Sequence, residues 1–240
     1  MKFHTREQSF HFSQIIRLLT QIIDDDFLSS HAYFKGGTCA SMLDLLDRFS
    51  VDLDFDLKRG TDKSKMDKSL RAIFDILSLK AKKESRQGLF YALKYPSVFP
   101  RRSLKLSITD EVFKANKYEK LYLPEIDRYA NCQTAETMFS NKLAAFTDRY
   151  RKYHTIAGRD LYDIHHFFTK NLAYSADLIK ERTGMETRDY FKYLNRFISD
   201  KISNRIITGD LNYLLPKEKI EALGKTLKTE TLFFLKQEIG

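Results

Sequence analysis

Residues 31–57 read HAYFKGGTCASMLDLLDRFSVDLDFDL, and this stretch decides the fold. Its first part, residues 31–35, predicts a short strand that stops at Gly36 and Gly37. Residues 38–46 have the apolar spacing of a helix, and a second strand follows that helix. The stretch therefore predicts a unit of strand, turn, helix and strand.

The second strand carries acidic residues at every other position. Over residues 50–57, apolar side chains alternate with Asp52, Asp54 and Asp56, so the three carboxylates share one face of the strand. The Cα atoms of Asp52 and Asp54 are expected roughly 6.5–7 Å apart, and their carboxylates can converge on one cation. Mg²⁺ prefers oxygen ligands and often takes one or two protein carboxylates. A solvated edge strand with a polar face is the alternative.

The turn between these elements is a second candidate site. Glycines at positions 36 and 37 allow a ligand to approach the backbone closely, and the N-terminus of the following helix offers N–H groups to phosphate. Thr38 is a candidate N-cap that adds a hydroxyl. A tight turn with a capped helix explains the same residues. Thirteen residues separate Thr38 from Asp52, so a phosphate cradle and a metal site would lie on consecutive elements.

The remaining chain predicts a mixed first part and a helical second part. In the first part we expect helices over 10–28 and 62–79 and strands over 87–95 and 103–109, while 120–133 is ambiguous and extended. In the second part we expect helices over 134–151, 159–170, 173–182, 187–204 and 216–237. The fold class is therefore α+β, with one domain over 1–133 and a helical domain over 134–240.

Composition excludes several classes of protein. The chain has 240 residues, 42% hydrophobic and 30% charged, which argues against global disorder. It has no apolar run of the roughly 18 residues that a membrane span needs. Two cysteines are too few for a disulfide framework, and we expect no secretory signal at the N-terminus. We therefore expect a cytoplasmic protein with no membrane partner.

The positive charge is concentrated in one segment. The chain carries a net charge of +9, and residues 58–109 hold 14 Lys and Arg against 4 Asp and Glu. Such a segment predicts a surface for a polyanion, with a solvated surface as the alternative. Neighbouring strand residues Phe90 and Tyr91 point to opposite faces, so at most one can stack on a base. We expect Tyr91 to be that residue.

The residues 35–38 (KGGT) and 48–56 (RFSVDLDFD) resemble the signature of the AbiEii/AbiGii toxin family. Lys142 and the stretch 159–163 (RDLYD) resemble later motifs of the same family. The resemblance extends from about residue 30 to residue 166. It implies a minimal nucleotidyltransferase with a polymerase-β-like fold, followed here by the helical domain.

This resemblance also implies roles for particular residues. Asp52 and Asp54 would hold Mg²⁺ and carry catalysis with Lys142 and Asp160, and Lys142 would bring positive charge to the phosphates. The division of roles between Asp160 and Asp163 stays open: either could orient Lys142 or act as a base. The implied nucleotide-binding residues are Lys35, Gly36, Gly37, Thr38, Arg48, Ser50 and Asp163.

The implied activity is transfer of a nucleoside monophosphate from an NTP to RNA, with the 3′ end of tRNA as the preferred acceptor. The implied context is the toxin of a toxin–antitoxin or phage-defence system, with an antitoxin protein as a partner. Transfer of AMP to protein hydroxyls is one alternative. A non-catalytic, basic RNA- or partner-binding module is another, and a metal-dependent nuclease is a third.

One departure from the polymerase-β-like pattern favours a one-metal mechanism. Ser107 stands where a third carboxylate is expected on a later strand, and Asp110 lies just beyond it. Three histidines flank the RDLYD stretch, at positions 154, 165 and 166. Joint metal ligation by His165 and His166 is not expected, because neighbouring residues on a helix do not share a face.

Overall fold

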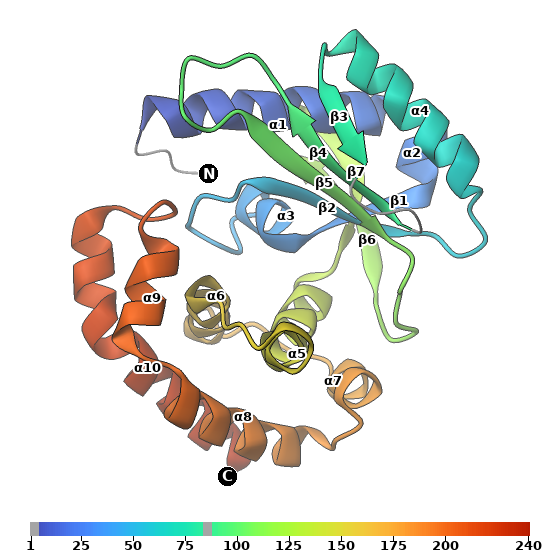
Figure 1. The fold of residues 1–240 in the computed structure, drawn as a ribbon. Coiled ribbons are helices and arrows are strands. Elements are labelled where there is room, and N and C mark those ends of the chain that lie inside the picture. The colour runs from blue at the N-terminus through green and yellow to red at the C-terminus, as the bar shows by residue number, and fades with distance from the viewer. Residues whose placement is uncertain (1–4, 84–87) are drawn as a thin grey trace. The chain divides into compact units, whose positions relative to one another are not determined.

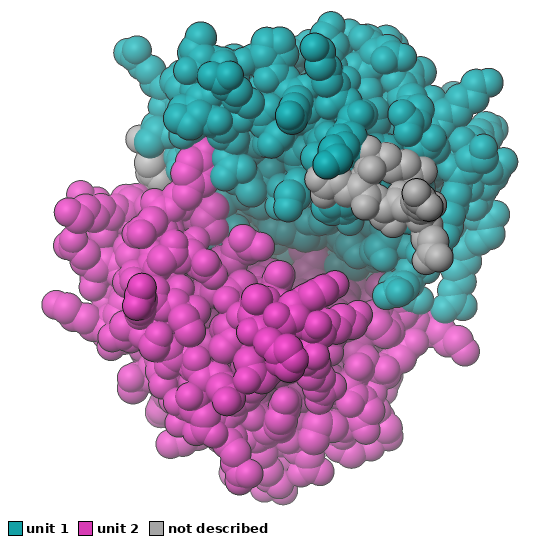
Figure 2. Space-filling model, viewed as in Figure 1, with its two compact units in different colours: residues 1–112, 117–134 teal, residues 113–116, 135–240 magenta. Residues whose placement is uncertain are grey.

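The structure is a computed structural model that describes residues 5–83 and 88–240. Arg86 of the basic segment and the first residue of the expected strand 87–95 lie outside the described residues, as does the N-terminus over 1–4. The chain divides into two compact units, residues 1–112 with 117–134 and residues 113–116 with 135–240 (Figure 2). The function of each unit stays a prediction.

Unit 1 is built on a seven-stranded mixed sheet with the strand order β3-β4-β5-β2-β1-β7-β6 (Figure 1). In the centre, β2 pairs antiparallel with β1 and parallel with β5. The strands are β1 (Ala32–Lys35), β2 (Asp52–Leu57), β3 (Lys80–Lys83), β4 (Leu89–Lys94), β5 (Ser103–Thr109), β6 (Tyr118–Leu123) and β7 (Arg128–Gln133). The α+β class predicted from the sequence is confirmed.

Helices α1 (Arg6–Asp24), α2 (Asp26–His31) and α4 (Lys63–Ile76) pack together and against the sheet (Figure 1). On α1, side chains at helical spacing form a fully buried stripe of Ile15, Leu18, Leu19 and Ile22. The sheet contributes Phe34, Leu53, Phe55 and Leu106, which are also fully buried. Burying such apolar side chains is the main stabilising contribution to the fold.

In unit 1 one predicted helix is wrong, one strand was not predicted, and one segment left ambiguous is now resolved. The expected helix over 10–28 breaks at Asp25, whose backbone is extended and whose carboxylate caps α2 by accepting from the Leu28 N–H at 2.8 Å. The strand β3 was not predicted, because its sequence KAKK lacks apolar alternation. The ambiguous segment 120–133 forms the antiparallel pair β6 and β7.

Unit 2 is helical over its described length. Its helices are α5 (Ala135–Tyr153), α6 (Gly158–Thr169), α7 (Ala176–Thr183), α8 (Thr187–Lys201), α9 (Asn204–Leu211) and α10 (Lys217–Ile239). The short helix α9 was not predicted. The segment 113–116 joins this unit because the Glu181 carboxylate accepts hydrogen bonds from the backbone N–H groups of Lys114 and Ala115, at 2.8 and 2.9 Å. None of the helices described is both long and apolar enough to cross a membrane.

Candidate functional site

The acidic strand β2 divides its side chains between the two faces of the sheet. Leu53 and Phe55 are fully buried in the core, whereas Asp52 and Asp54 are half-buried on the opposite side. We call this side, which carries Asp52, Asp54 and Asp56, the polar face. The period of two predicted this division, and the structure follows it.

The two glycines of the turn lie directly against residues of the acidic strand and its approach. Gly36 has a φ of +79°, and a Cβ there would lie 2.6 Å from Asp54 Oδ2. A Cβ at Gly37 would lie 2.9 Å from Ser50 Oγ and 3.0 Å from Arg48 Nη2. Side chains other than glycine would push these groups apart, so the close packing favours glycine at positions 36 and 37.

Thr38 and Arg48 hold the backbone around the strand. The expectation that Thr38 caps the helix is wrong, because α3 (Gly36–Met42) begins two residues earlier. The buried Thr38 hydroxyl instead donates to the Asp52 carbonyl at 2.5 Å. Arg48 is also buried, and its Nη1 donates to the Phe49 carbonyl at 3.0 Å. Phosphate binding by either residue stays a prediction.

Asp56 is held in a different way from the other two acids. Its side chain is 2% exposed, and it accepts from Lys35 Nζ at 2.6 Å, Tyr118 Oη at 2.8 Å and Gln133 Nε2 at 2.6 Å. The ion pair offsets the cost of burying the carboxylate. Asp56 and Lys35 therefore form an ion pair within the packing of unit 1, and nucleotide binding by Lys35 stays a prediction.

Asp52 and Asp54 are the residues that fit a divalent cation. Among the described residues, no group of three or more His, Cys, Asp or Glu side chains is arranged to hold a metal ion. Mg²⁺ does not need such a group, because it usually takes one or two carboxylates and completes its shell with water and substrate phosphates. The donor set on β2 fits this mode of binding.

The position of the expected third carboxylate is occupied by Ser107. Strands β2 and β5 pair in parallel with Asp54 opposite Ser107 and Asp52 opposite Lys105. Asp110 follows β5, and its carboxylate pairs with Lys63 at the start of α4. The polar face thus presents a hydroxyl and an ammonium beside the two acids, where a third acid was expected.

Unit 2 contains an ion-pair cluster in which the carboxylates of Asp160 and Asp163 are buried and the cations of Lys142 and Arg149 are half-buried. Lys142 Nζ on α5 lies 3.0 Å from Asp160 Oδ1 and 2.9 Å from Asp163 Oδ2 on α6. Arg149 Nε lies 3.3 Å from the other oxygen of Asp160. Burial raises the pKa of Asp160, but the charges of Lys142 and Arg149 and the hydrogen bond from Lys142 together outweigh it and hold that pKa below its usual value. Both carboxylates thus contact the ammonium of Lys142.

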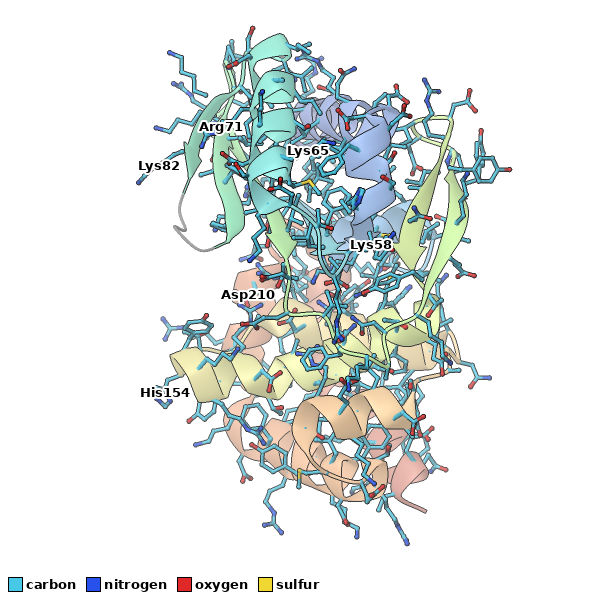
Figure 3. The ribbon with its side chains drawn as sticks, turned by 90° about the vertical axis from the view of Figure 1, so that its right-hand side faces the viewer. Lys58, Lys65, Arg71, Lys82, His154 and Asp210 are labelled. Atoms are coloured by element: carbon cyan, nitrogen blue, oxygen red, sulfur yellow. The ribbon has the colours of Figure 1, made fainter. Side chains whose placement is uncertain are left out.

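The three histidines do not form a common site. His165 Nε2 lies 2.7 Å from the Glu230 carboxylate on α10. The His166 ring stacks on Tyr162 at 6.0 Å between centroids. His154 is exposed after α5 (Figure 3).

The prediction that Tyr91 stacks on a base is wrong. Tyr91 is fully buried, its ring packs on Phe74, and its hydroxyl donates to Asp67, both on α4. Its neighbour Phe90 lies opposite Ser107 and therefore on the polar face. The apolar residues two positions on either side of Tyr91, Leu89 and Leu93, are the sequence signal that could have identified the buried face.

Sequence reasoning also missed a buried histidine that positions the start of β2. His11 Nε2 lies 2.9 Å from the Val51 carbonyl, and Nδ1 lies 2.6 Å from Tyr95 Oη. Burial lowers the pKa of His11 to about 4, so the ring is neutral at pH 7. The neutral ring donates from Nε2 to Val51 and accepts at Nδ1 from Tyr95. Its position four residues before Ile15 places it on the buried stripe of α1.

Comparison with known proteins gives one family. The family described as "Nucleotidyl transferase AbiEii toxin, Type IV TA system" matches residues 17–230. Comparison with curated proteins finds no match. Among solved structures, a candidate nucleotidyltransferase from H. pylori is similar with 18% identity and a TM-score of 0.61, covering 98% of this chain and 97% of that one. JHP933 from Helicobacter pylori is similar with 19% identity and a TM-score of 0.58, covering 98% and 94%.

Proposed function

Because the chain belongs to the AbiEii family of nucleotidyltransferase toxins, we propose that it transfers a nucleoside monophosphate from an NTP to RNA in a Mg²⁺-dependent reaction. The proposed acceptor is the 3′ end of tRNA. We also propose that the protein acts in the cytoplasm as the toxin of a toxin–antitoxin or phage-defence system, with a cognate antitoxin protein as its partner.

The packing of the Gly36–Gly37 turn against Asp54 and Arg48 carries this proposal. It brings the turn at the start of α3 directly against a strand that carries two carboxylates on one face. The carboxylates would hold Mg²⁺, which supplies charge stabilisation to the triphosphate in the transition state. Ser50 and Arg48 beside Gly37 would position the phosphates.

In the proposed reaction, a hydroxyl oxygen of the acceptor attacks the α-phosphorus of the NTP. The bond between the α-phosphorus and the oxygen bridging to the β-phosphate breaks, and pyrophosphate leaves. The proton of the attacking hydroxyl passes to a base or to solvent. Such a reaction depends mainly on positioning and on electrostatic stabilisation, with little covalent chemistry for the protein to perform.

For unit 2 we propose that Lys142 acts on the phosphates of the substrate. Asp160 and Asp163 then serve as positioning residues, because both carboxylates fix the ammonium of Lys142. In this proposal the two acids share the positioning of Lys142, and neither acts alone on it.

The experiment incubates the protein with total tRNA, Mg²⁺ and each α-labelled NTP in turn. Label on RNA, together with release of pyrophosphate, is the expected result. Label on the protein itself or on an added protein would make a protein hydroxyl the acceptor. RNA cleavage without NTP would indicate a nuclease, and binding without metal-dependent turnover would indicate a non-catalytic module.

A further inference from the structure

The polar face continues beyond the two acids toward one edge of the sheet. Across β2, β5, β4 and β3, the residues paired in register with Asp52 are Lys105, then Ala92, then Lys82. Paired residues of neighbouring strands lie on the same side of a sheet, and strands are about 4.8 Å apart. The row therefore runs from Asp52 over about 14 Å to the edge strand β3.

Four exposed lysines occupy this part of the polar face. Lys94 and Lys80 form a neighbouring row, beside Lys105 and Lys82 of the first row, and all four side chains are exposed. Among the described residues of β3, β4 and β5 that lie on the polar face, none is acidic. The basic side chains of the segment 58–109 therefore form two groups, one on this part of the polar face and another on α4 (Figure 3).

An aromatic ring lies between these lysines and the acids. Phe90 is paired with Ser107, which in turn is paired with Asp54, so the ring lies two strands from Asp54. Phe90 is half-buried, and Lys105 Nζ lies over its ring, 6.0 Å from the centroid. A half-open aromatic ring next to ammonium groups is the arrangement that holds an unpaired base and its phosphates.

We propose that this surface, which we call the lysine face (Lys80, Lys82, Lys94, Lys105 and Phe90), binds the single-stranded end of the RNA acceptor. The lysines bind successive phosphates, and Phe90 stacks on a base close to Asp54. The single strand is favoured over a duplex because duplex bases are already stacked and cannot lie on the ring. This inference rests on the proposed function for the identity of the acceptor, but it predicts RNA binding even without turnover.

The test measures binding of a fluorescent single-stranded RNA of about twelve nucleotides, without NTP, at several salt concentrations. We expect the triple variant Lys82→Gln, Lys94→Gln, Lys105→Gln to bind at least tenfold more weakly. The slope of log affinity against log salt falls by about 2, because each phosphate contact on a single strand contributes about 0.7. The matched control, Lys65→Gln, Lys68→Gln, Arg71→Gln on α4, keeps the wild-type slope.

The contribution of Phe90 is tested separately. Phe90→Ala is expected to weaken binding about 5- to 100-fold with no change in the salt slope, since stacking is not electrostatic. Phe90→Tyr keeps the ring and restores binding, whereas Phe90→Leu keeps apolar bulk and does not. Circular dichroism of each variant checks that the fold is intact.

Equal losses in the two triple variants would overturn the proposal, because binding would then follow total charge. An unchanged affinity in Phe90→Ala, or tighter binding of duplex RNA than of single strands, would also overturn it. The proposed function fails independently if the wild type binds RNA on the lysine face but transfers no nucleotide. The inference alone fails if the wild type labels RNA and the lysine variants label it with an unchanged KM.

Discussion

Lys35 is paired with Asp54 in the backbone register of β1 and β2, yet its ammonium lies 2.6 Å from Asp56 Oδ1 on the same strand. Tyr118 and Gln133 bind the other oxygen of Asp56. Three identical acids on one strand therefore have two different environments. Asp56 belongs to the fold, and Asp52 and Asp54 are the pair proposed for catalysis.

The buried position of Asp56 predicts that Asp56→Asn destabilises unit 1. Removing one partner of a buried ion pair costs about 3 kcal/mol, since it leaves Lys35 without its counter-charge. Chemical denaturation of wild type and variant measures the difference. Asp52→Asn and Asp54→Asn should cost much less, because both side chains are half-buried. Equal stability losses in all three variants would contradict this division.

The close approach of Gly36 to Asp54 predicts that Gly36→Ala damages activity more than stability. The new Cβ would lie 2.6 Å from Asp54 Oδ2 and would displace the carboxylate. We expect transfer to fall at least about 100-fold, by analogy with other misplaced catalytic groups.

Gly60→Ala is the matched control for this substitution. Gly60 has a φ of +78°, almost the same as Gly36, but nothing lies within 4 Å of its Cβ position. Both variants should lose about 1 kcal/mol of stability from backbone strain, and Gly36→Ala should lose more because its Cβ also meets Asp54. Only Gly36→Ala should lose activity. A comparable loss of transfer in Gly60→Ala would mean that backbone strain, and not contact with Asp54, is responsible.

His11 predicts a loss of stability in mild acid. Its pKa of about 4 in the folded protein lies below the ordinary value of 6.5. The unfolded chain therefore binds the proton more tightly, and the free energy of unfolding falls as the pH decreases from 6.5 to 4. The loss amounts to about 3 kcal/mol over this range.

The variant His11→Gln isolates this contribution. Its free energy of unfolding should depend less on pH between 4 and 6.5 than that of the wild type, whereas His154→Gln, at an exposed position, should follow the wild type. Urea denaturation at intervals of half a pH unit measures both curves. If the free energy of unfolding depends on pH in the same way in the wild type and in His11→Gln, the assignment of a neutral, buried imidazole to His11 is contradicted.

The cluster on α5 and α6 predicts that the stability deficit of Lys142→Met depends on pH. Without the ammonium, only Arg149 opposes burial, so the pKa of Asp160 rises relative to its value in the wild type. The variant should be less stable than the wild type at pH 7 by about 3–5 kcal/mol. This deficit should shrink as the pH falls toward 4 and the buried acids take up protons. A deficit that stays constant with pH would show that lost packing, and not charge, is the cause.

The sequence predicted the centre of the fold well because each local signal there agreed with the tertiary structure. The alternation in 50–57 identified β2, its two faces and both candidate metal ligands. The pattern of apolar and polar residues failed to predict a strand where pairing with a neighbouring strand decides the structure. Strand β3 has three lysines in four residues and is a strand because it pairs with β4 at the sheet edge.

Long-range partners also decided the environments of side chains that the sequence left undetermined. Asp56 could not be separated from Asp52 and Asp54 in the sequence, because its partners Tyr118 and Gln133 lie 62 and 77 residues away. His11 depends in the same way on Val51 and Tyr95. By contrast, the sequence alone indicates which face of β4 is buried, because Leu89 and Leu93 lie two positions before and after Tyr91.

The assignment of catalysis to Asp54 is tested by comparing nucleotidyl transfer by the wild type, Asp54→Asn and Asp56→Asn, with labelled NTP, tRNA and Mg²⁺, at a temperature where all three are folded. We predict transfer by the wild type, loss of at least about 1000-fold in Asp54→Asn, and a much smaller loss in the folded fraction of Asp56→Asn. Wild-type rates in Asp54→Asn would contradict it, because the polar face of β2 would then not be the catalytic centre.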